Sequence, residues 1–313
     1  MKRIEITINK LLVLCVVTGI LTYSLIAEER RNGMKDDTET RAIMRGLRVF
    51  TCGHSFHYWV ADNLSQIAVS AGISNHQVVG VSAIGASTAI QHWRVPEGQN
   101  QARKALQAGN VDVLTLSCMT HPDEGISKFA KLAVAHNPNV RVTLQELWLP
   151  EDRFPFDPEH RVRKSVDEFN GSTMADLIKT HQAYFKEMED YVTALNAEIG
   201  KQAVFIVPDA QATLALRGRI LAGTAPGLTK QSDLFSDAWG HPTPPLMALS
   251  SYCHFAVIYR RNPVGLPLPK ILAGNPKWDA KLNLLLQELA WDAVKQHPLS
   301  GIHKPPRDRL IVN

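Results

Sequence analysis

The chain has 313 residues, a formal net charge of +4 and 45% hydrophobic residues, which suits one large domain with a sizeable core. No basic run or stripe stands out, so the composition argues against nucleic acid as a partner.

The first 27 residues predict a secretory signal. A basic start containing Lys2, Arg3 and Lys10 precedes the apolar run Leu11–Ala27, and the charged stretch EERRNG follows. A basic region, an apolar region and a small residue in this order are typical of a signal peptide. An uncleaved anchor is the alternative, because about 17 apolar residues approach the minimum that spans a bilayer. We therefore expect an exported protein, periplasmic or extracellular, with membrane anchoring as the second choice.

Residues 28–44 form a charged leader without apolar periodicity, and residues 45–313 are expected to form a single domain. Removing residues 1–27 takes away three basic side chains and one acidic one, so the formal charge falls from +4 to +2. Three cysteines remain, Cys52, Cys118 and Cys253, and such an odd, sparse set is not a disulfide framework. Buried free thiols are the expectation, with a Cys52–Cys118 bridge as the alternative. No Cys/His spacing matches a zinc site, and we expect neither a metal nor an organic cofactor.

Short apolar runs alternate with helical patterns along the domain. The expected strands are Leu47–Cys52, Gln77–Val81, Val111–Ser117, Val140–Leu147 and Ala203–Val207. Four of them are nearly continuous apolar runs, as in parallel strands covered on both faces. Helices are expected within residues 58–72, 99–109, 125–136, 172–199 and 277–297, with another that starts near Pro244. This alternation predicts an α/β fold with a doubly wound sheet.

Ligands of such sheets bind beyond the carboxyl ends of the strands. Ser55, residues 82–88, residues 118–121 and Trp148 follow the first four expected strands. The long polar loop at residues 148–171 is a candidate wall or lid for a site there.

Ser55 lies in the turn Gly-His-Ser after the first strand, where it is either a helix cap or a nucleophile. A serine hydroxyl needs a base, usually a histidine that a carboxylate orients. Asp237 and His241 lie four residues apart in the loop SDAWGHP, so the chain offers the order Ser, Asp, His. We therefore favour the interpretation of Ser55 as a nucleophile over that of a helix cap.

These stretches make the chain resemble a known family. GHSF after the first strand, GVSAIGAST after the second and DAWGHP near the C-terminus are similar to blocks of the SGNH/GDSL esterase superfamily. The resemblance covers about residues 47–297 and implies a three-layer α/β/α sandwich with a mainly parallel five-stranded sheet. It also implies Ser55 as nucleophile, His241 as base and Asp237 as orienter. The backbone N–H groups of Ser55 and Gly85 would then form the oxyanion hole.

Two features depart from the family pattern. The family's Asp stands three residues before the His, where this chain has Ala238; Asp233 is a distant second candidate for the orienter. The third block, LSCMTHPDEG, lacks the Asn that normally donates to the oxyanion, and we expect Thr120 or His121 to donate instead. A Gly-x-Ser-x-Gly elbow fits less well, because Phe56-His57 leaves no second Gly.

Other polar and aromatic residues are candidates for the cleft. The segment QHWR, with His92, Trp93 and Arg94, follows Gly85 and is expected to contact the substrate. Trp93 and Trp148 are either core residues or platforms for a sugar ring, and we include Trp148 among the expected substrate contacts. The histidines His54, His57, His92 and His121 are expected on a solvated polar rim, whereas His254 falls in an apolar helix and should be a core residue.

The sequence thus predicts an exported serine esterase whose substrate is a small-molecule or carbohydrate ester, with an acetyl ester on a carbohydrate favoured. The alternative is a catalytically silent domain that binds a glycan or a protein partner. A lipid-acting esterase would require the N-terminal anchor.

Overall fold

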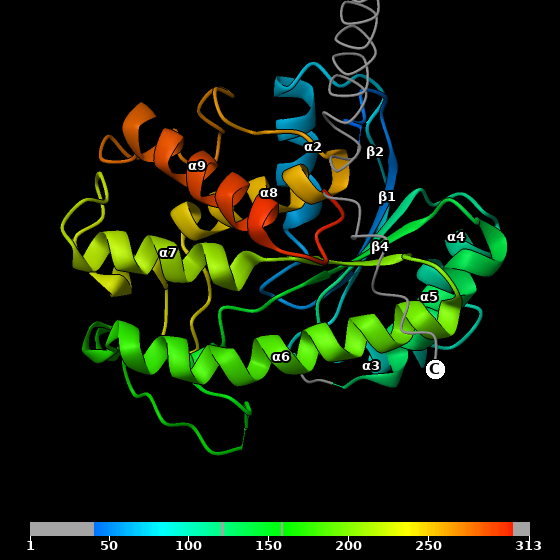
Figure 1. Ribbon diagram of the computed structural model, residues 1–313, viewed down its shortest axis with the longest axis horizontal. Coiled ribbons are helices and arrows are strands. Elements are labelled where there is room, and N and C mark those ends of the chain that lie inside the picture. Colours follow the sequence, from blue (N-terminus) through cyan, green and yellow to red (C-terminus); the bar gives the residue numbers. More distant parts are fainter. Residues whose placement is uncertain (1–40, 120–121, 158, 303–313) are drawn as a thin grey trace, which may run out of the picture. The chain divides into compact units, whose positions relative to one another are not determined.

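A parallel β-sheet forms the centre of the molecule (Figure 1). The computed structural model describes residues 41–119, 122–157 and 159–302. Within these residues the strands are β1 (Arg48–Gly53), β2 (Gln77–Ala83), β3 (Val113–Leu116), β4 (Arg141–Gln145) and β5 (Val204–Val207). They are ordered β2-β1-β3-β4-β5, and each neighbouring pair is parallel. All five expected strands are present, which confirms the predicted α/β class.

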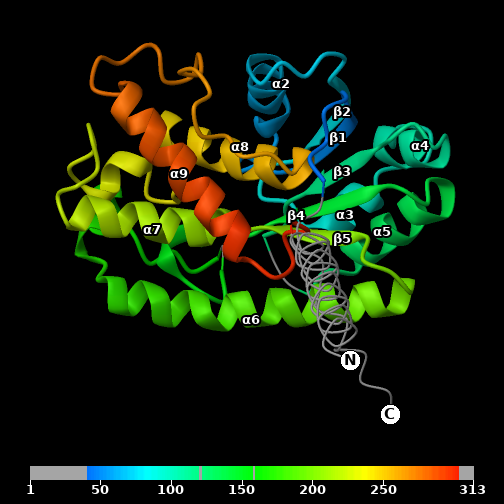
Figure 2. The ribbon, with the colours of Figure 1, turned by 45° about the horizontal axis from the view of Figure 1, so that its top comes forward.

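Helices cover both faces of the sheet. The described helices are α2 (Val60–Ser70), α3 (Ala89–Trp93), α4 (Gln101–Gln107), α5 (Glu124–His136), α6 (Met174–Ile199), α7 (Asp209–Leu221), α8 (Pro244–Tyr259) and α9 (Ala280–Gln296). Helices α2, α8 and α9 lie on one side of the sheet, and α3, α5 and α6 lie on the other (Figure 2). The arrangement is the predicted three-layer sandwich.

The order of the strands determines where a site can form. The chain passes from β1 to β2 on one side and then returns to β3 on the other side of β1. The crossovers therefore diverge at β1, and in doubly wound sheets ligands bind beyond the carboxyl ends of the strands at such a point. Strands β1, β3, β4 and β5 are buried along nearly their whole length, although β5 lies at one edge of the sheet, whereas β2 at the other edge is partly exposed.

Two described helices have no counterpart among the expected ones. Helix α3 has only five residues. Helix α7 buries Asp209, Thr213 and Arg217 beside its apolar side chains, so its sequence shows no clean apolar stripe. The other expected helices are present, and α8 begins at Pro244.

Several predictions about the ends of the chain lie outside the described residues. These are the signal segment 1–27 and residues 28–40 of the leader, whereas the described residues all belong to one compact unit. Cys52, Cys118 and Cys253 are buried free thiols, as expected, and the Cys52–Cys118 bridge is not formed. Among the described residues, no helix combines the length and the apolar character needed to cross a membrane.

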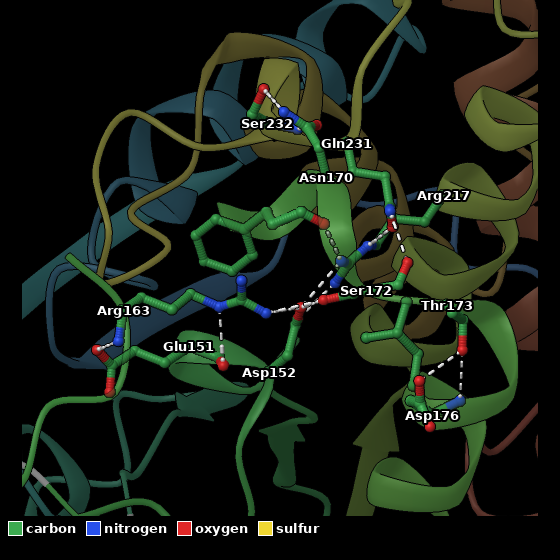
Figure 3. A network of polar contacts seen from close by, with 12 residues as sticks. Glu151, Asp152, Arg163, Asn170, Ser172, Thr173, Asp176, Arg217, Gln231 and Ser232 are labelled. Atoms are coloured by element: carbon green, nitrogen blue, oxygen red, sulfur yellow. Dashed lines mark hydrogen bonds and ion pairs between the residues drawn. The ribbon is translucent and has the colours of Figure 1, made fainter. Parts of the chain in front are cut away.

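A buried ion-pair network fixes the loop of residues 148–171 (Figure 3). Arg217 of α7 binds both carboxylate oxygens of Asp152, at 2.5 and 2.9 Å, and Arg163 contacts the same carboxylate at 2.8 Å. The Arg217 side chain is 1% exposed and that of Asp152 is 6% exposed. The Ser172 hydroxyl donates to Asp152, and the Arg217 Nε–H donates to Gln231. One carboxylate thus ties both ends of the loop to α7.

We predict that Asp152→Ala lowers the free energy of unfolding by about 3–5 kcal/mol, because it leaves the buried positive charge of Arg217 without the carboxylate that it pairs with. Urea unfolding of the two proteins measures the difference. Asp190→Ala is the matched control, since Asp190 pairs with Lys186 on the surface of α6, and an exposed pair contributes only about 0–1 kcal/mol. Equal losses in the two variants would contradict the role assigned to Asp152.

Candidate active site

Ser55 lies in the turn that follows β1, at the carboxyl edge of the sheet. Its side chain is half-buried, and its carbonyl oxygen accepts a hydrogen bond from Trp59 Nε1 at 2.9 Å. The turn is tight because the N–H groups of His57 and Tyr58 both donate to the carbonyl of His54. A Cβ atom at Gly53 would lie 2.8 Å from the ring of His57, so this turn requires glycine at the end of β1. Hydrogen bonds within the turn and close packing against Gly53 therefore hold the backbone at Ser55.

His241 and Asp237 meet Ser55 in the arrangement of a serine hydrolase. Ser55 Oγ lies 2.9 Å from His241 Nε2, and His241 Nδ1 lies 2.7 Å from Asp237 Oδ2. A carboxylate only accepts, so Nδ1 carries the proton and Nε2 is left to accept from the serine hydroxyl. The side chains of His241 and Asp237 are 37% and 43% exposed, which keeps the site open to solvent. The three residues can therefore transfer a proton from Ser55 to His241.

The loop geometry explains how Asp237 works at a spacing of four residues. Its Oδ1 accepts from the backbone N–H groups of Trp239, Gly240 and His241 at 2.9, 3.1 and 3.2 Å, while Oδ2 faces the ring. The loop turns back through Gly240, whose φ of 91° favours glycine. The carboxylate of Asp233 instead accepts from the N–H groups of Thr229 and Lys230. In this structure it is Asp237 that contacts the His241 ring.

Hydrogen bonds stabilise the ionised form of the Asp237 carboxylate. Burial alone would raise the pKa of its carboxyl group, but hydrogen bonds from the backbone and ring of His241 and from Trp239 lower the pKa below its ordinary value. Asp237 is therefore ionised at neutral pH and can hold the imidazole in the tautomer that accepts from Ser55.

Trp148 supports the base from inside the protein, which corrects the expectation that it contacts the substrate. Its side chain is 1% exposed, and its Nε1 donates to the carbonyl of Gly240 at 2.9 Å. Its ring stacks on Phe56 with centroids 5.3 Å apart, and Phe56 meets the His241 ring edge-on at 4.9 Å. Trp148 therefore packs beneath the catalytic loop and cannot serve as a surface platform for a sugar.

Within the segment of His92, Trp93 and Arg94, His92 differs from its expected role. His92 is 1% exposed and bridges the hydroxyls of Ser82 and Ser87, each at 2.7 Å. The Trp93 ring packs on Phe129 and Arg103, and Arg94 pairs with Glu124. These contacts turn the segment toward α4 and α5. The ring of His92 stabilises the loop that carries Gly85, and its burial excludes direct contact with a substrate.

Gly85 lies at the same edge of the sheet as Ser55. Gly53 pairs with Ala83 across β1 and β2, so Gly85 and Ser55 each follow by two residues at the same edge of the sheet. Gly85 is exposed, and Asp123 fixes the end of its loop by accepting from the N–H groups of Ala89 and Ile90. The other candidate donors, Thr120 and His121, lie outside the described residues.

His54, His57 and His92 do not lie on the expected solvated rim, and the fourth histidine expected there, His121, lies outside the described residues. His54 and His57 are fully buried, as is His92. Burial lowers the pKa of His54 to about 3 and the pKa values of His57 and His92 to about 4. These rings are neutral structural groups whose partners are hydroxyls and an amide. His254 is buried in α8, as predicted.

The loop of residues 148–171 packs against Trp239, close to His241. No sequence motif identified the individual residues that make these contacts. The half-buried Trp239, two positions before His241, meets Phe156 with ring centroids 5.8 Å apart, and the Arg161 guanidinium lies over the Trp239 ring at 4.4 Å. Only the length and polarity of this loop marked it as a candidate wall. Within the described residues, no cluster of His, Cys, Asp and Glu could hold a metal ion.

Comparisons with known proteins show distant likenesses. No family model and no curated protein matches the chain. Among solved structures, a DUF4886 family protein from Bacteroides uniformis is 14% identical with a TM-score of 0.49, over 80% of this chain and 95% of that chain. A candidate GDSL-like lipase from Parabacteroides merdae is 10% identical with a TM-score of 0.39, over 81% of this chain and 98% of that chain. The roles proposed below therefore rest on the side chains of this chain.

We predict that the protein loses stability steeply in mild acid. His54, His57 and His92 stay neutral in the folded state to pH values of about 3–4, whereas an unfolded histidine takes up a proton near pH 6.5. The unfolded chain therefore binds more protons as the pH falls from about 6.5 to about 4, and the free energy of unfolding decreases throughout this range.

Urea unfolding between pH 7 and pH 4.5 tests this prediction. His92→Gln should reduce the slope by about one proton, or about 1.4 kcal/mol per pH unit. His136→Gln, on the exposed surface of α5, is the control. An unchanged slope in His92→Gln would show that His92 is not a buried neutral group.

Proposed function

We propose that the protein is a serine esterase with Ser55 as nucleophile, His241 as base and Asp237 as orienter. The observation that carries the proposal is the continuous hydrogen-bonded set: Ser55 Oγ at 2.9 Å from His241 Nε2, and His241 Nδ1 at 2.7 Å from Asp237. An isolated capping serine needs no such base, and Ser55 Oγ is directed to the imidazole. The half-exposed site also leaves the hydroxyl accessible to a substrate.

In the first half of the reaction, Ser55 Oγ forms a bond to the ester carbonyl carbon while His241 Nε2 takes the hydroxyl proton. Negative charge develops on the carbonyl oxygen, and the backbone N–H groups of Ser55 and Gly85 are the proposed donors. Thr120 or His121 remains the proposed third donor. The imidazolium, stabilised by Asp237, then gives its proton to the departing alkoxide, and the acyl group stays on Ser55.

In the second half, a water molecule attacks the acyl carbon and gives a proton to His241 Nε2. The tetrahedral species collapses, the acid leaves, and the proton returns to Ser55 Oγ. Every proton passes through His241, and this chemistry requires no cofactor.

We further propose an acetyl ester on a carbohydrate as the substrate. Trp148 gives this proposal no support, because it is buried. The half-buried Trp239, beside His241 and in contact with Phe156, is the aromatic side chain better placed to meet a sugar ring. Export of the mature chain, predicted from residues 1–27, would fit an extracellular polysaccharide.

A silent domain that binds a glycan is the rival proposal. The specific observation in its favour is the third block, CMTHP, which lacks an Asn donor for the oxyanion. A missing donor lowers the rate by about 10²–10³-fold, so a slow esterase and a silent domain differ measurably.

We predict that Ser55→Ala and His241→Ala each reduce p-nitrophenyl acetate hydrolysis to near the uncatalysed rate, because the two residues act as a unit. Asp237→Ala should retain roughly ten- to a hundredfold more activity than these two, since the base survives without its orienter. Initial rates over a range of substrate concentrations measure kcat and KM for each variant.

Asp233→Ala is the control for Asp237→Ala, because Asp233 caps a neighbouring turn and does not reach His241. The thermal midpoint of Ser55→Ala should stay near that of the wild type, since the hydroxyl makes only the described contact with His241. Substantial hydrolysis by Ser55→Ala would rule out Ser55 as the nucleophile, and a larger loss in Asp233→Ala than in Asp237→Ala would show that the orienter is misassigned.

A further inference from the structure

A buried glutamine connects the turn that bears Ser55 to helix α8. Gln145, the last residue of β4, is fully buried. Its Nε2 donates to the carbonyl of Phe56 at 3.2 Å, and its Oε1 lies 2.5 Å from His57 Nδ1 and 3.2 Å from His254 Nε2. Phe56 and His57 are the two residues that directly follow Ser55 in the chain.

The pattern of acceptors assigns the protons in this network. The carbonyl of Phe56 can only accept, which places the amide nitrogen of Gln145 beside it. Both imidazole nitrogens that face Oε1 must then donate, so His57 is protonated at Nδ1 and His254 at Nε2. His57 Nε2 is left as an acceptor for the hydroxyl of Thr115, at 3.1 Å. One amide therefore accounts for the tautomers of two buried histidines.

The groups around Gln145 make the network neutral. Burial lowers the pKa of His57 to about 4 and the pKa of His254 well below its usual range. Asp209 of α7 lies behind His254, 3.6 Å from its Nε2, and burial raises the pKa of its carboxyl well above the ordinary value. From β3 the network receives the hydroxyl of Thr115, and the neighbouring Glu146 turns to Gln211. Gln145 thus makes its hydrogen bonds among uncharged partners.

We propose that Gln145 is a positioning residue for Ser55, an inference that rests on the proposed esterase function. It holds the turn through two hydrogen bonds, one to the carbonyl oxygen of Phe56 and one to His57 Nδ1. The ring in turn packs against Gly53, so that both sides of Ser55 are held. Gln145 is buried and acts only through these contacts.

The position of Ser55 matters because Oγ must keep its 2.9 Å contact with His241 while it approaches a carbonyl carbon. A displacement of about 1 Å in a catalytic group can lower the rate by about 10²-fold. Loss of the Gln145 contacts should therefore lower kcat and leave KM within about twofold, since the substrate does not touch Gln145.

Gln145→Glu tests the hydrogen bond with a change that keeps the shape of the side chain. As a carboxylate, the substituted side chain places an oxygen next to the carbonyl oxygen of Phe56, and it cannot donate a hydrogen bond. As a neutral acid, its O–H replaces the amide N–H as donor to the same carbonyl. Where the substituted side chain is ionised, the ratio of kcat in the variant to kcat in the wild type should be about 10⁻², and the ratio should rise toward one as the pH falls and the acid becomes neutral. Gln145→Met, which cannot donate at any pH, should show the loss without the recovery.

Gln287→Glu is the matched control. Gln287 is equally buried and donates to Tyr252 and Leu266 in a network between α8 and the loop before α9. Its substitution introduces the same acid into the interior, yet it should leave the wild-type pH profile of kcat. A kcat ratio for Gln145→Glu that stays at about 10⁻² from pH 8 to pH 5.5, or full kcat in Gln145→Met, would overturn the proposal.

A separate measurement distinguishes this failure from failure of the esterase itself. If the wild type hydrolyses no ester, the proposed function has failed, and the imidazole ¹⁵N shifts then decide the role of Gln145. In the wild type, His57 should be protonated at Nδ1, and His241 Nε2 should show its hydrogen bond from Ser55. Gln145→Met should weaken the His241 signature, and Gln287→Met should not. Unchanged His241 shifts in Gln145→Met would overturn the positioning role.

Discussion

The hydrogen bond between Ser55 and His241 joins two loops that lie 186 positions apart in the sequence. It forms only if the turn after β1 and the loop before α8 arrive at the same edge of the sheet. The parallel strand order supplies the first condition, because the crossovers diverge at β1 and leave its carboxyl end at the edge where ligands bind in such sheets. The stack of Trp148 on Phe56 supplies the second, since it ties the carbonyl of Gly240 to the turn that bears Ser55.

Each of the three loops of the proposed active site therefore has its own support from within the core. Gln145 holds the turn of Ser55, Trp148 holds the loop of His241, and His92 holds the loop of Gly85. These supports are polar or aromatic side chains buried among hydrogen-bond partners. A buried polar side chain without its partner costs about 1–3 kcal/mol, so such contacts favour one arrangement of the loops over its competitors. The buried side chains beneath these loops, and not the exposed residues, therefore determine the geometry of the proposed site.

Sequence reasoning predicted the parts that depend on local pattern. Apolar runs identified the strands, and the order Ser, Asp, His at loop positions identified the three residues that the fold brings together. Burial of individual polar residues was not predictable in the same way, because His54, His57 and His92 carry no local sign of their distant partners. Helix α7 was missed for a related reason: Arg217 faces inward only because Asp152, 65 positions earlier, neutralises it. Trp148 follows a strand end like a ligand-binding residue, and only tertiary packing places it under the loop.

The central claim is that Ser55 is a nucleophile activated by His241. The most direct measurement is the reaction of the purified wild-type protein with a fluorophosphonate, followed by mass spectrometry of its peptides. We predict one adduct, on Ser55, which forms rapidly in the wild type and at least about 10²-fold more slowly in His241→Ala. A wild-type protein that stays unlabelled at Ser55, or a His241→Ala variant that is labelled equally fast, would show that His241 does not activate Ser55 as a nucleophile.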